Sequence, residues 1–275
     1  MNKQSYLLFI FLLMLASYAQ AQGGHGPSFT LATPTLPKGN WNFDLTLMSL
    51  HQPQQRGWMT RQTLRYGLTE NLQLNLSIPQ IIRPLLSPPR TRLAPMMGSF
   101  SDAEGSIFWR FHRQDLNIGS RFESTVLISF SYPLYQQQGN IPTRPGGHLA
   151  VVTGYASRTL YLWTGGGIQA YLPGDSGQPG TAYYLTGTLG WRPPIFQNDY
   201  PKPDWRIFLE TFIEHATPSR TATGHLTPTA TRWLAGPSVL GLYGKWGIAF
   251  GLLFPIHQQP VEENSRFLLN LSYWL

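Results

Sequence analysis

The sequence predicts an all-β fold, namely a transmembrane, antiparallel, up-and-down β-barrel of about twelve strands. Three observations support this prediction. Only 12% of the residues are charged, although 42% are hydrophobic. Segments of strand length alternate between apolar and polar residues along nearly the whole chain from Trp41 onward. Short and long connections alternate between these segments, as they do in bacterial outer-membrane barrels.

The N-terminal residues predict export from the cytoplasm. Lys3 precedes the apolar run Tyr6–Ala16, which is too short to span a bilayer, and Ala19 and Ala21 provide small residues for cleavage. We therefore expect a Sec signal peptide over residues 1–21, a flexible N-terminal segment over residues 22–38 and an outer-membrane β-barrel over residues 39–275. The chain contains no cysteine, which excludes disulfides, thiolate metal sites and a lipid-modified cysteine.

The first predicted strands alternate with a period of two, so that apolar side chains lie on one face and polar side chains on the other. The segment Leu72–Ile78 is the cleanest, because every second residue is Leu or Ile. Gln62 interrupts the apolar row of the segment before it. These first segments are Trp41–Leu50, Trp58–Tyr66, Leu72–Ile78 and Ser106–His112.

The next segment, Arg121–Leu134, separates into a mostly apolar row that ends in an aromatic residue and a mostly polar row. In a soluble β-sandwich or a lipocalin-like barrel, the apolar row would face the core. We expect it to face lipid instead, because aromatic residues end the apolar rows of the other strands too, as in the interfacial girdles of membrane barrels. The lipid-facing row holds Phe122, Val126, Ile128 and Phe130, and the opposite row holds Arg121 and Glu123.

The remaining segments complete the predicted barrel. Two of them show weaker alternation, and Pro237 interrupts a third. The last one resembles the C-terminal strand signal of outer-membrane barrels, although it ends in Leu275 where those usually end in Phe. These segments are His148–Ser157, Leu160–Leu172, Ala182–Arg192, Trp205–His215, Arg232–Tyr243, Lys245–Phe254 and Phe267–Leu275.

The connections divide into two classes, which predict periplasmic turns at one end and external loops at the other. Short connections are expected at residues 67–71, 113–117, 158–159 and 244, and long ones at residues 51–57, 79–101, 133–147, 173–181, 216–231 and 255–264. The connection at residues 193–204 is an exception, because it is long and falls on the short-turn side. The even number of strands returns both termini to the periplasm.

Charged residues in the polar rows are the candidate functional residues, because opposed charges in a narrow lumen can select solutes. The alternative is that inward-facing charges pair with one another and fill the interior without leaving a pore. Both interpretations concern the same lumen-lining set: Asp44, Arg61, Arg65, Arg110, Arg121, Glu123, Arg206, Glu210 and Glu214.

Other patterns do not predict chemistry. The seven histidines form no pair at metal-ligand spacing, and a metal-capturing "GGHGP" tail around His25 competes with a simple disordered end. Glu214 with His215, and His148 with Ser157, lack the spacing diagnostic of a lipase or deacylase, and no GxSxG motif occurs. We therefore expect no catalytic, metal-binding or cofactor-binding residues and no cofactor.

Several stretches of the chain have the pattern of a known family: "TPTLPKGNWNFDL", "YGLTENLQLNLSIP", "GSIFWRFHRQ" and "GWRPPIFQNDYPKPDWRIFLE". They resemble the outer-membrane transporter family named for the meta-pathway of phenol degradation. The likeness extends loosely over most of the chain after the signal peptide, and its motifs are structural. The family name implies uptake of aromatic compounds, but the resemblance implies no substrate-binding signature and no catalytic residue.

The sequence thus predicts a non-enzymatic outer-membrane channel or transporter for passive passage of small solutes, including hydrophobic or aromatic compounds. A barrel-embedded lipid-modifying enzyme and a structural barrel without transport are the alternatives. The net charge of +7 is scattered along the chain, which argues against a nucleic-acid partner. The expected partners are outer-membrane lipid and lipopolysaccharide, whose phosphates suit the arginines of residues 79–101, although that loop could also narrow the mouth.

Overall fold

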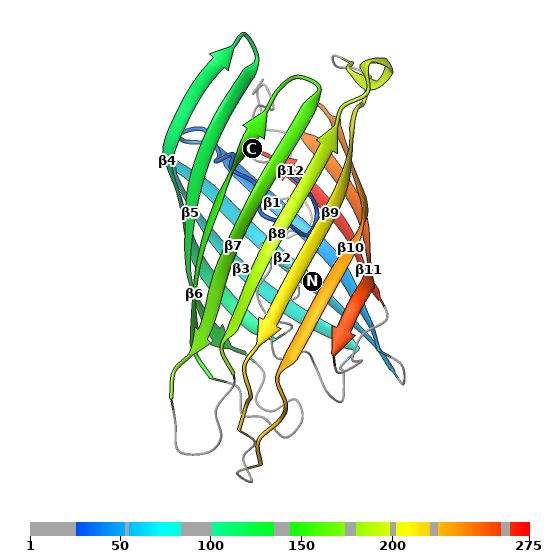
Figure 1. The fold of residues 1–275 in the computed structure, drawn as a ribbon. Helices are drawn as coiled ribbons and strands as arrows, with labels where there is room; N and C mark the ends of the chain where they lie inside the picture. The colour runs from blue at the N-terminus through cyan, green and yellow to red at the C-terminus, as the bar shows by residue number, and fades with distance from the viewer. Residues whose placement is uncertain are drawn as a thin grey trace, which may run out of the picture.

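A computed structural model describes residues 26–52, 55–83, 101–134, 144–173, 180–198, 202–220, 225–259 and 265–275. The expected signal peptide, His25 and most of the 79–101 connection lie outside these ranges. Twelve strands form one closed barrel in which every strand pairs with its neighbours in sequence and β1 pairs with β12 (Figure 1). All of these pairings are antiparallel. The all-β, up-and-down barrel predicted from the alternation is confirmed.

Each predicted segment forms one strand. The strands are β1 (Trp41–Gln52), β2 (Gln55–Thr69), β3 (Leu72–Arg83), β4 (Asp102–Asn117), β5 (Ser120–Pro133), β6 (Gly146–Ala156), β7 (Leu160–Tyr171), β8 (Ala182–Trp191), β9 (Asp204–Ala216), β10 (Ala230–Tyr243), β11 (Trp246–Gln259) and β12 (Ser265–Trp274). A short 3-10 helix, η1 (Pro194–Phe196), lies in the exceptional connection between β8 and β9. No helix in the described ranges is long and apolar enough to cross a membrane.

Strands continue into several of the predicted connections; β3, for example, reaches Arg83 and β11 reaches Gln259. Residues 113–117 belong to β4, and the turn consists of Ile118 and Gly119, where Gly119 has a positive φ of 81°. At residues 51–57, β1 and β2 continue to Gln52 and from Gln55. The error has a physical cause: a strand that extends beyond the apolar layer is solvated on both faces, so its polarity no longer marks where the strand ends. Residues 111–117 are accordingly all exposed.

Pro237 is accommodated inside β10 on its exposed face. Opposite β11, the pairing passes from Ala235–Phe254 to Ser238–Gly251, which leaves Gly236 and Pro237 without a partner in that register. On the other side, Pro237 lies opposite Leu209 of β9. Because proline has no N–H group to donate, this break in one ladder lets the strand continue through it.

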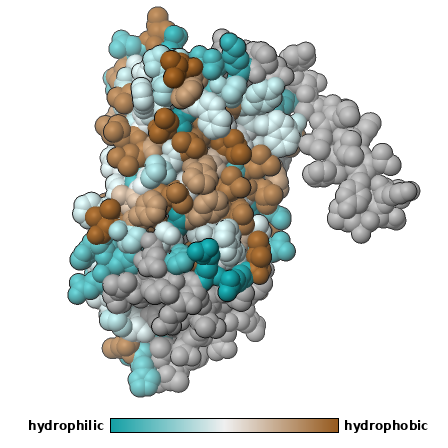
Figure 2. Space-filling model, turned by 90° about the vertical axis from the view of Figure 1, so that its right-hand side faces the viewer, coloured by the Kyte–Doolittle hydropathy of each residue, from teal (hydrophilic) through white to brown (hydrophobic). Residues whose placement is uncertain are grey.

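The two faces of the wall differ as the alternation of β5 predicted. Ile128 and Phe130 are 54% and 56% exposed, whereas Glu123 and Thr125 are fully buried. Figure 2 shows that apolar side chains gather in a broad area on one side of the outer surface. An apolar outer band on a closed barrel is the surface that lipid requires.

The core lies inside the barrel. Its buried apolar residues come from the inward-facing rows of the strands and from the segment that precedes β1, which runs inside the ring of strands (Figure 1, blue). The two ends of the barrel differ in their connections. The short-turn end carries the β2–β3, β4–β5, β6–β7, β8–β9 and β10–β11 connections, and the long-loop end carries the others.

Candidate functional site

The segment that precedes β1 occupies the lumen. We call residues 26–38 the N-terminal segment. Its central residues are almost entirely buried, including Phe29, Thr30, Leu31 and Thr33. The sequence predicts a flexible segment over residues 22–38, whereas in the structure residues 28–33 pack against the inner wall. The interior therefore contains a length of chain as well as side chains.

One carboxylate on β9 receives the far end of the N-terminal segment. The backbone N–H groups of Ser28 and Phe29 donate to Glu210 at 2.8 Å each, and that of Thr30 donates at 2.7 Å. The Thr30 hydroxyl donates to the same carboxylate at 2.8 Å, and the hydroxyl of Ser238 on β10 also donates to it. Glu210 is fully buried, and these donors stabilise its charge away from water.

The middle of the segment is held at Thr33. The hydroxyl of Thr125 donates to the Thr33 carbonyl oxygen at 2.6 Å, and the indole N–H of Trp163 donates to the Thr33 hydroxyl at 3.1 Å. The Thr33 hydroxyl in turn donates to Glu123 at 3.2 Å. Strands β5 and β7 thus fix the segment about halfway along its path.

The segment leaves the lumen beside the β2–β3 turn. The Leu36 N–H donates to the Gln73 side-chain oxygen at 2.8 Å, and the Thr35 hydroxyl donates to the Glu70 carbonyl at 3.1 Å. A Cβ on Gly67 would lie 2.0 Å from the Pro37 carbonyl oxygen. Only glycine leaves room for the backbone of the segment at this point.

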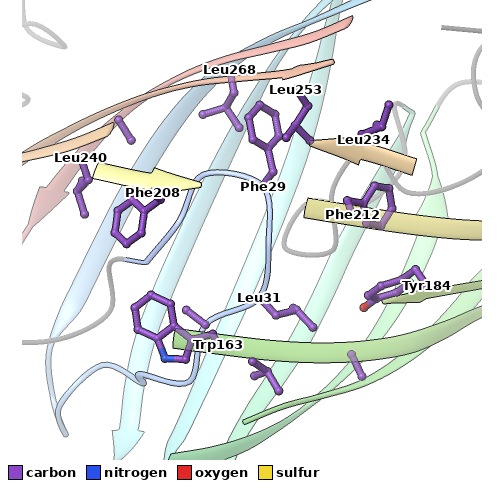
Figure 3. Packing of buried hydrophobic residues seen from close by; sticks show 14 of the residues in the cluster. Phe29, Leu31, Trp163, Tyr184, Phe208, Phe212, Leu234, Leu240, Leu253 and Leu268 are labelled. Carbon is purple, nitrogen blue, oxygen red and sulfur yellow. The ribbon is translucent and has the colours of Figure 1, made fainter. Parts of the chain in front are cut away.

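Apolar contacts complete the seating of the segment. Figure 3 shows Phe29 and Leu31 on the segment, directed toward different parts of the inner wall. A Cβ on Gly251 would lie 2.5 Å from the Phe29 ring, so the ring rests directly on the backbone of β11. The same view shows the inward-facing residues that surround them: Trp163, Tyr184, Phe208, Phe212, Leu234, Leu240, Leu253 and Leu268.

The charged residues singled out from the sequence all lie on the inner, buried or half-buried side of their strands. Arg110, Arg121 and Glu123 form the group expected from the pairing of β4 with β5. Glu123 lies 2.8 Å from Arg110 and 3.1 Å from Arg121. Arg110 also donates to the Asn71 side-chain oxygen at 3.0 Å and to the Glu70 carbonyl at 2.6 Å.

Arg206, Glu210 and Glu214 share the polar row of one predicted strand, which predicts a second group of mixed charge; in the structure this group does not form. Arg206 pairs with Asp204 at 3.3 Å and lies over the Tyr161 ring, whereas Glu214 pairs with Arg232 of β10 at 2.8 Å. The reason is geometric: residues four apart along a strand are separated by roughly 13 Å at about 3.3 Å per residue. Residues two apart in one row, such as Asp204 and Arg206, can therefore pair, but residues four or more apart in that row cannot.

A third charged group lines a cavity that the segment leaves open. Asp44 of β1 and Arg65 of β2 pair at 2.5 Å, and Arg61 donates to the Ser77 hydroxyl at 2.8 Å and to the Asp102 carbonyl at 3.1 Å. The cavity has a volume of about 60 Å³. Its lining comprises Gly26, Pro27, Ser28, Thr30, Ala32 and Pro34 of the segment, and Asp44, Thr46, Arg61, Thr63, Arg65, Leu240, Ala249, Leu268 and Asn270 of the wall.

Some interior residues were missed by the sequence reasoning. Arg232 and Arg266 are buried charges on β10 and β12, and Arg266 lies over the Phe212 ring. The alternation contained a signal for Arg266, which falls in the row opposite the apolar residues of the last segment. Phe208 and Phe212 also lie in the polar row of β9, so the interior is more apolar than a purely charged lumen would be.

The two residue pairs that were considered as parts of a lipase or deacylase site do not form such a site in the structure. Glu214 is buried and His215 is exposed, because neighbours on a strand point to opposite faces. His148 contacts the hydroxyls of Tyr184 and Ser129 at 2.5 Å and 3.4 Å, while Ser157 takes part in the β6–β7 turn. Within the described ranges, no three His, Asp or Glu side chains are grouped so that they could hold a metal ion.

Known proteins resemble this chain in fold rather than in sequence. No protein-family model matches it, and no curated protein matches it. The outer-membrane channel COG4313 from Pseudomonas putida F1 aligns over 88% of this chain and 97% of its own, with a TM-score of 0.57 and 13% identity. The KdgM porin aligns over 84% and 98% (TM-score 0.47, 10% identity), and the NanC porin over 83% and 97% (TM-score 0.46, 10% identity). The likeness to the P. putida channel shows that the chain has the fold of an outer-membrane β-barrel.

Proposed function

We propose that the chain is an outer-membrane channel for passive passage of small solutes, whose lumen is narrowed by its own N-terminal segment. The observation that carries the proposal is the cavity between the segment and the β1–β2 wall. Its charged lining of Asp44, Arg61 and Arg65 suits a water-filled path. The interior thus holds the segment and, beside it, a cavity that the segment does not fill.

The lining of the cavity bears on the class of solute. Leu240, Ala249 and Leu268 of the wall, with Pro27 and Pro34 of the segment, face the same space as the charged residues. A path with apolar and charged sides suits small solutes that combine an apolar body with a polar group. The inward-facing aromatic residues and the sequence resemblance to phenol-pathway transporters support hydrophobic or aromatic compounds within that class.

The proposal also includes the membrane in which the barrel lies and its orientation there. Its apolar outer band favours the outer membrane, with export directed by the signal peptide expected at residues 1–21. The short-turn end then faces the periplasm, and the long connections lie outside, next to lipopolysaccharide. The N-terminal segment enters the lumen from the short-turn end, beside the β2–β3 turn.

Conductance and uptake measurements test this function. The full mature chain, refolded into planar bilayers, should give small single-channel conductances. Liposomes that contain it should swell in small aromatic or short aliphatic solutes faster than in disaccharides, which are larger and more polar. A heat-modifiable, correctly folded barrel that gives neither conductance nor swelling would identify a structural barrel without transport.

A further inference from the structure

We propose that Glu210 is the residue that retains the N-terminal end of the segment in the lumen, so that loss of its carboxylate releases residues 26–31 and widens the path. The release of the segment is inferred from the contacts in the structure and does not depend on the proposed function. The widening of a conducting path rests on the proposed channel function, so release and conductance are measured separately.

The contacts of Glu210 differ in kind from the other contacts of the segment. Three successive backbone N–H groups, those of Ser28, Phe29 and Thr30, point to this one carboxylate. Successive N–H groups that converge in this way form an anion-binding concavity. At Thr33 and Leu36, by contrast, a single backbone group meets a single side chain of the wall, Thr125 or Gln73.

The arrangement is reciprocal. Glu210 is fully buried on the inner face of β9, and the ion pairs found among the described residues do not include it. Its charge is therefore stabilised by donors, most of which belong to the segment. The three N–H groups depend equally on Glu210, because a buried donor without an acceptor is strongly disfavoured. Removing the carboxylate leaves these three donors buried without an acceptor, which favours withdrawal of residues 28–30 from the lumen.

The contact with Glu210 lies where it controls how much of the lumen the segment fills. The segment is joined covalently to β1 and packs beside Gly67 at the short-turn end, so those residues stay in place. Residues 28–30 are at the other end of the described segment and carry Phe29 into the interior (Figure 3). Detachment there would free the space filled by Phe29 and Leu31 and join it to the cavity beside Asp44 and Arg65.

The first experiment measures where the segment lies, without any assay of transport. The chain has no cysteine, and the hydroxyls of Thr30 and Thr188 are in direct contact. The double variant Thr30→Cys/Thr188→Cys therefore places two thiols close enough for a disulfide. It keeps all three backbone donors to Glu210. The yield of the disulfide, read by thiol labelling of the folded barrel under mild oxidation, reports how often residue 30 contacts β8.

Glu210→Gln in this background is the test, and Glu214→Gln is the matched control. Gln keeps the size of the side chain, but its amide nitrogen cannot accept, so at least one N–H of the segment loses its partner. Glu214 lies on the same face of β9, is equally buried, and pairs with Arg232 rather than with the segment. We expect the disulfide yield to fall at least threefold for Glu210→Gln and to stay near that of the parent for Glu214→Gln. Equal yields in the two variants would overturn the proposal.

The second experiment asks whether release opens a path. With the thiols reduced, Glu210→Gln should raise the single-channel conductance severalfold over that of the parent with the two cysteine substitutions. Oxidation, in the molecules that form the disulfide, should return the conductance to the parent level. A fall in disulfide yield without a change in conductance would support retention by Glu210 and contradict the widening of a conducting path, whereas a parent without any conductance would contradict the channel function. If the raised conductance stays the same after oxidation has cross-linked all the molecules, release of the segment is not the cause of the rise.

A variant on the segment covers the case in which Glu210→Gln does not fold. Ser28→Pro removes one of the three N–H donors and leaves Glu210 and the wall unchanged. It should also lower the disulfide yield between residues 30 and 188. A yield equal to that of the parent would overturn the proposal from the side of the segment.

Discussion

The Arg110 guanidinium lies 2.8 Å from the carboxylate of Glu123, and both side chains are buried inside the barrel. Arg110 also binds the carbonyl of Glu70 and the side chain of Asn71, so it joins β4 to the β2–β3 turn as well as to β5. Glu123 accepts from Thr33 on the N-terminal segment. This pair therefore belongs to the packing that closes one side of the lumen.

Replacing Glu123 by Gln should destabilise the barrel rather than change its ion selectivity. The substitution leaves Arg110 buried without its anion, and breaking a buried pair in this way costs about 3–5 kcal/mol. Asp115→Asn is the control on the same hairpin, because Asp115 is 66% exposed in its pair with Arg113 and should contribute below about 1 kcal/mol. Urea unfolding in lipid vesicles measures both. A loss for Glu123→Gln no larger than for Asp115→Asn would contradict the structural role.

Ion selectivity should depend on Asp44 and Arg65, because their side chains line the open cavity. Asp44→Asn makes this path more positive and should shift the reversal potential under a salt gradient toward anions, while Arg65→Gln should shift it toward cations. Glu214→Gln serves as a control with the same loss of charge outside the cavity lining. An open channel whose selectivity responds to Glu214→Gln and not to Asp44→Asn would place the path elsewhere.

The strands could be predicted from the sequence, but the contents of the lumen could not. A strand with lipid on one side repeats every two residues, so the alternation of β3 or β5 is visible without any partner. The N-terminal segment has no such period. Whether its prolines and threonines enter a barrel depends on groups such as Glu210 and Gly67, which are far away in sequence. The pairing of neighbouring strands correctly predicted that Arg110 lies beside Glu123. The predicted grouping of Arg206 with Glu214 was wrong, because the two residues are too far apart along one strand.

The outer face provides a test of the membrane setting. Ile128→Arg or Leu209→Arg should cost about 2–4 kcal/mol if these exposed residues lie near the bilayer midplane. Ile118→Arg is the control, since Ile118 is 92% exposed in the β4–β5 turn, beyond the apolar band, where the cost falls to about 0–1 kcal/mol. Thr125→Arg, which the alternation alone would make tolerable, should be disruptive because Thr125 is buried against Thr33. Equal unfolding free energies for the Ile128 and Ile118 variants would contradict a lipid-facing row.

The final prediction concerns the exit of the segment beside the β2–β3 turn. Gly67→Ala would place a Cβ 2.0 Å from the Pro37 carbonyl oxygen, so either the turn or the segment must shift. Overpacking of this kind costs about 1–3 kcal/mol. Gly105→Ala is the matched control on β4, because its Cβ would meet no atom within 4 Å and the change should be nearly neutral. Urea unfolding midpoints give the cost, and the disulfide yield in the Thr30→Cys/Thr188→Cys background shows whether the segment moved. A Gly67→Ala barrel as stable as Gly105→Ala, with an unchanged yield, would mean that the segment does not pass over this turn.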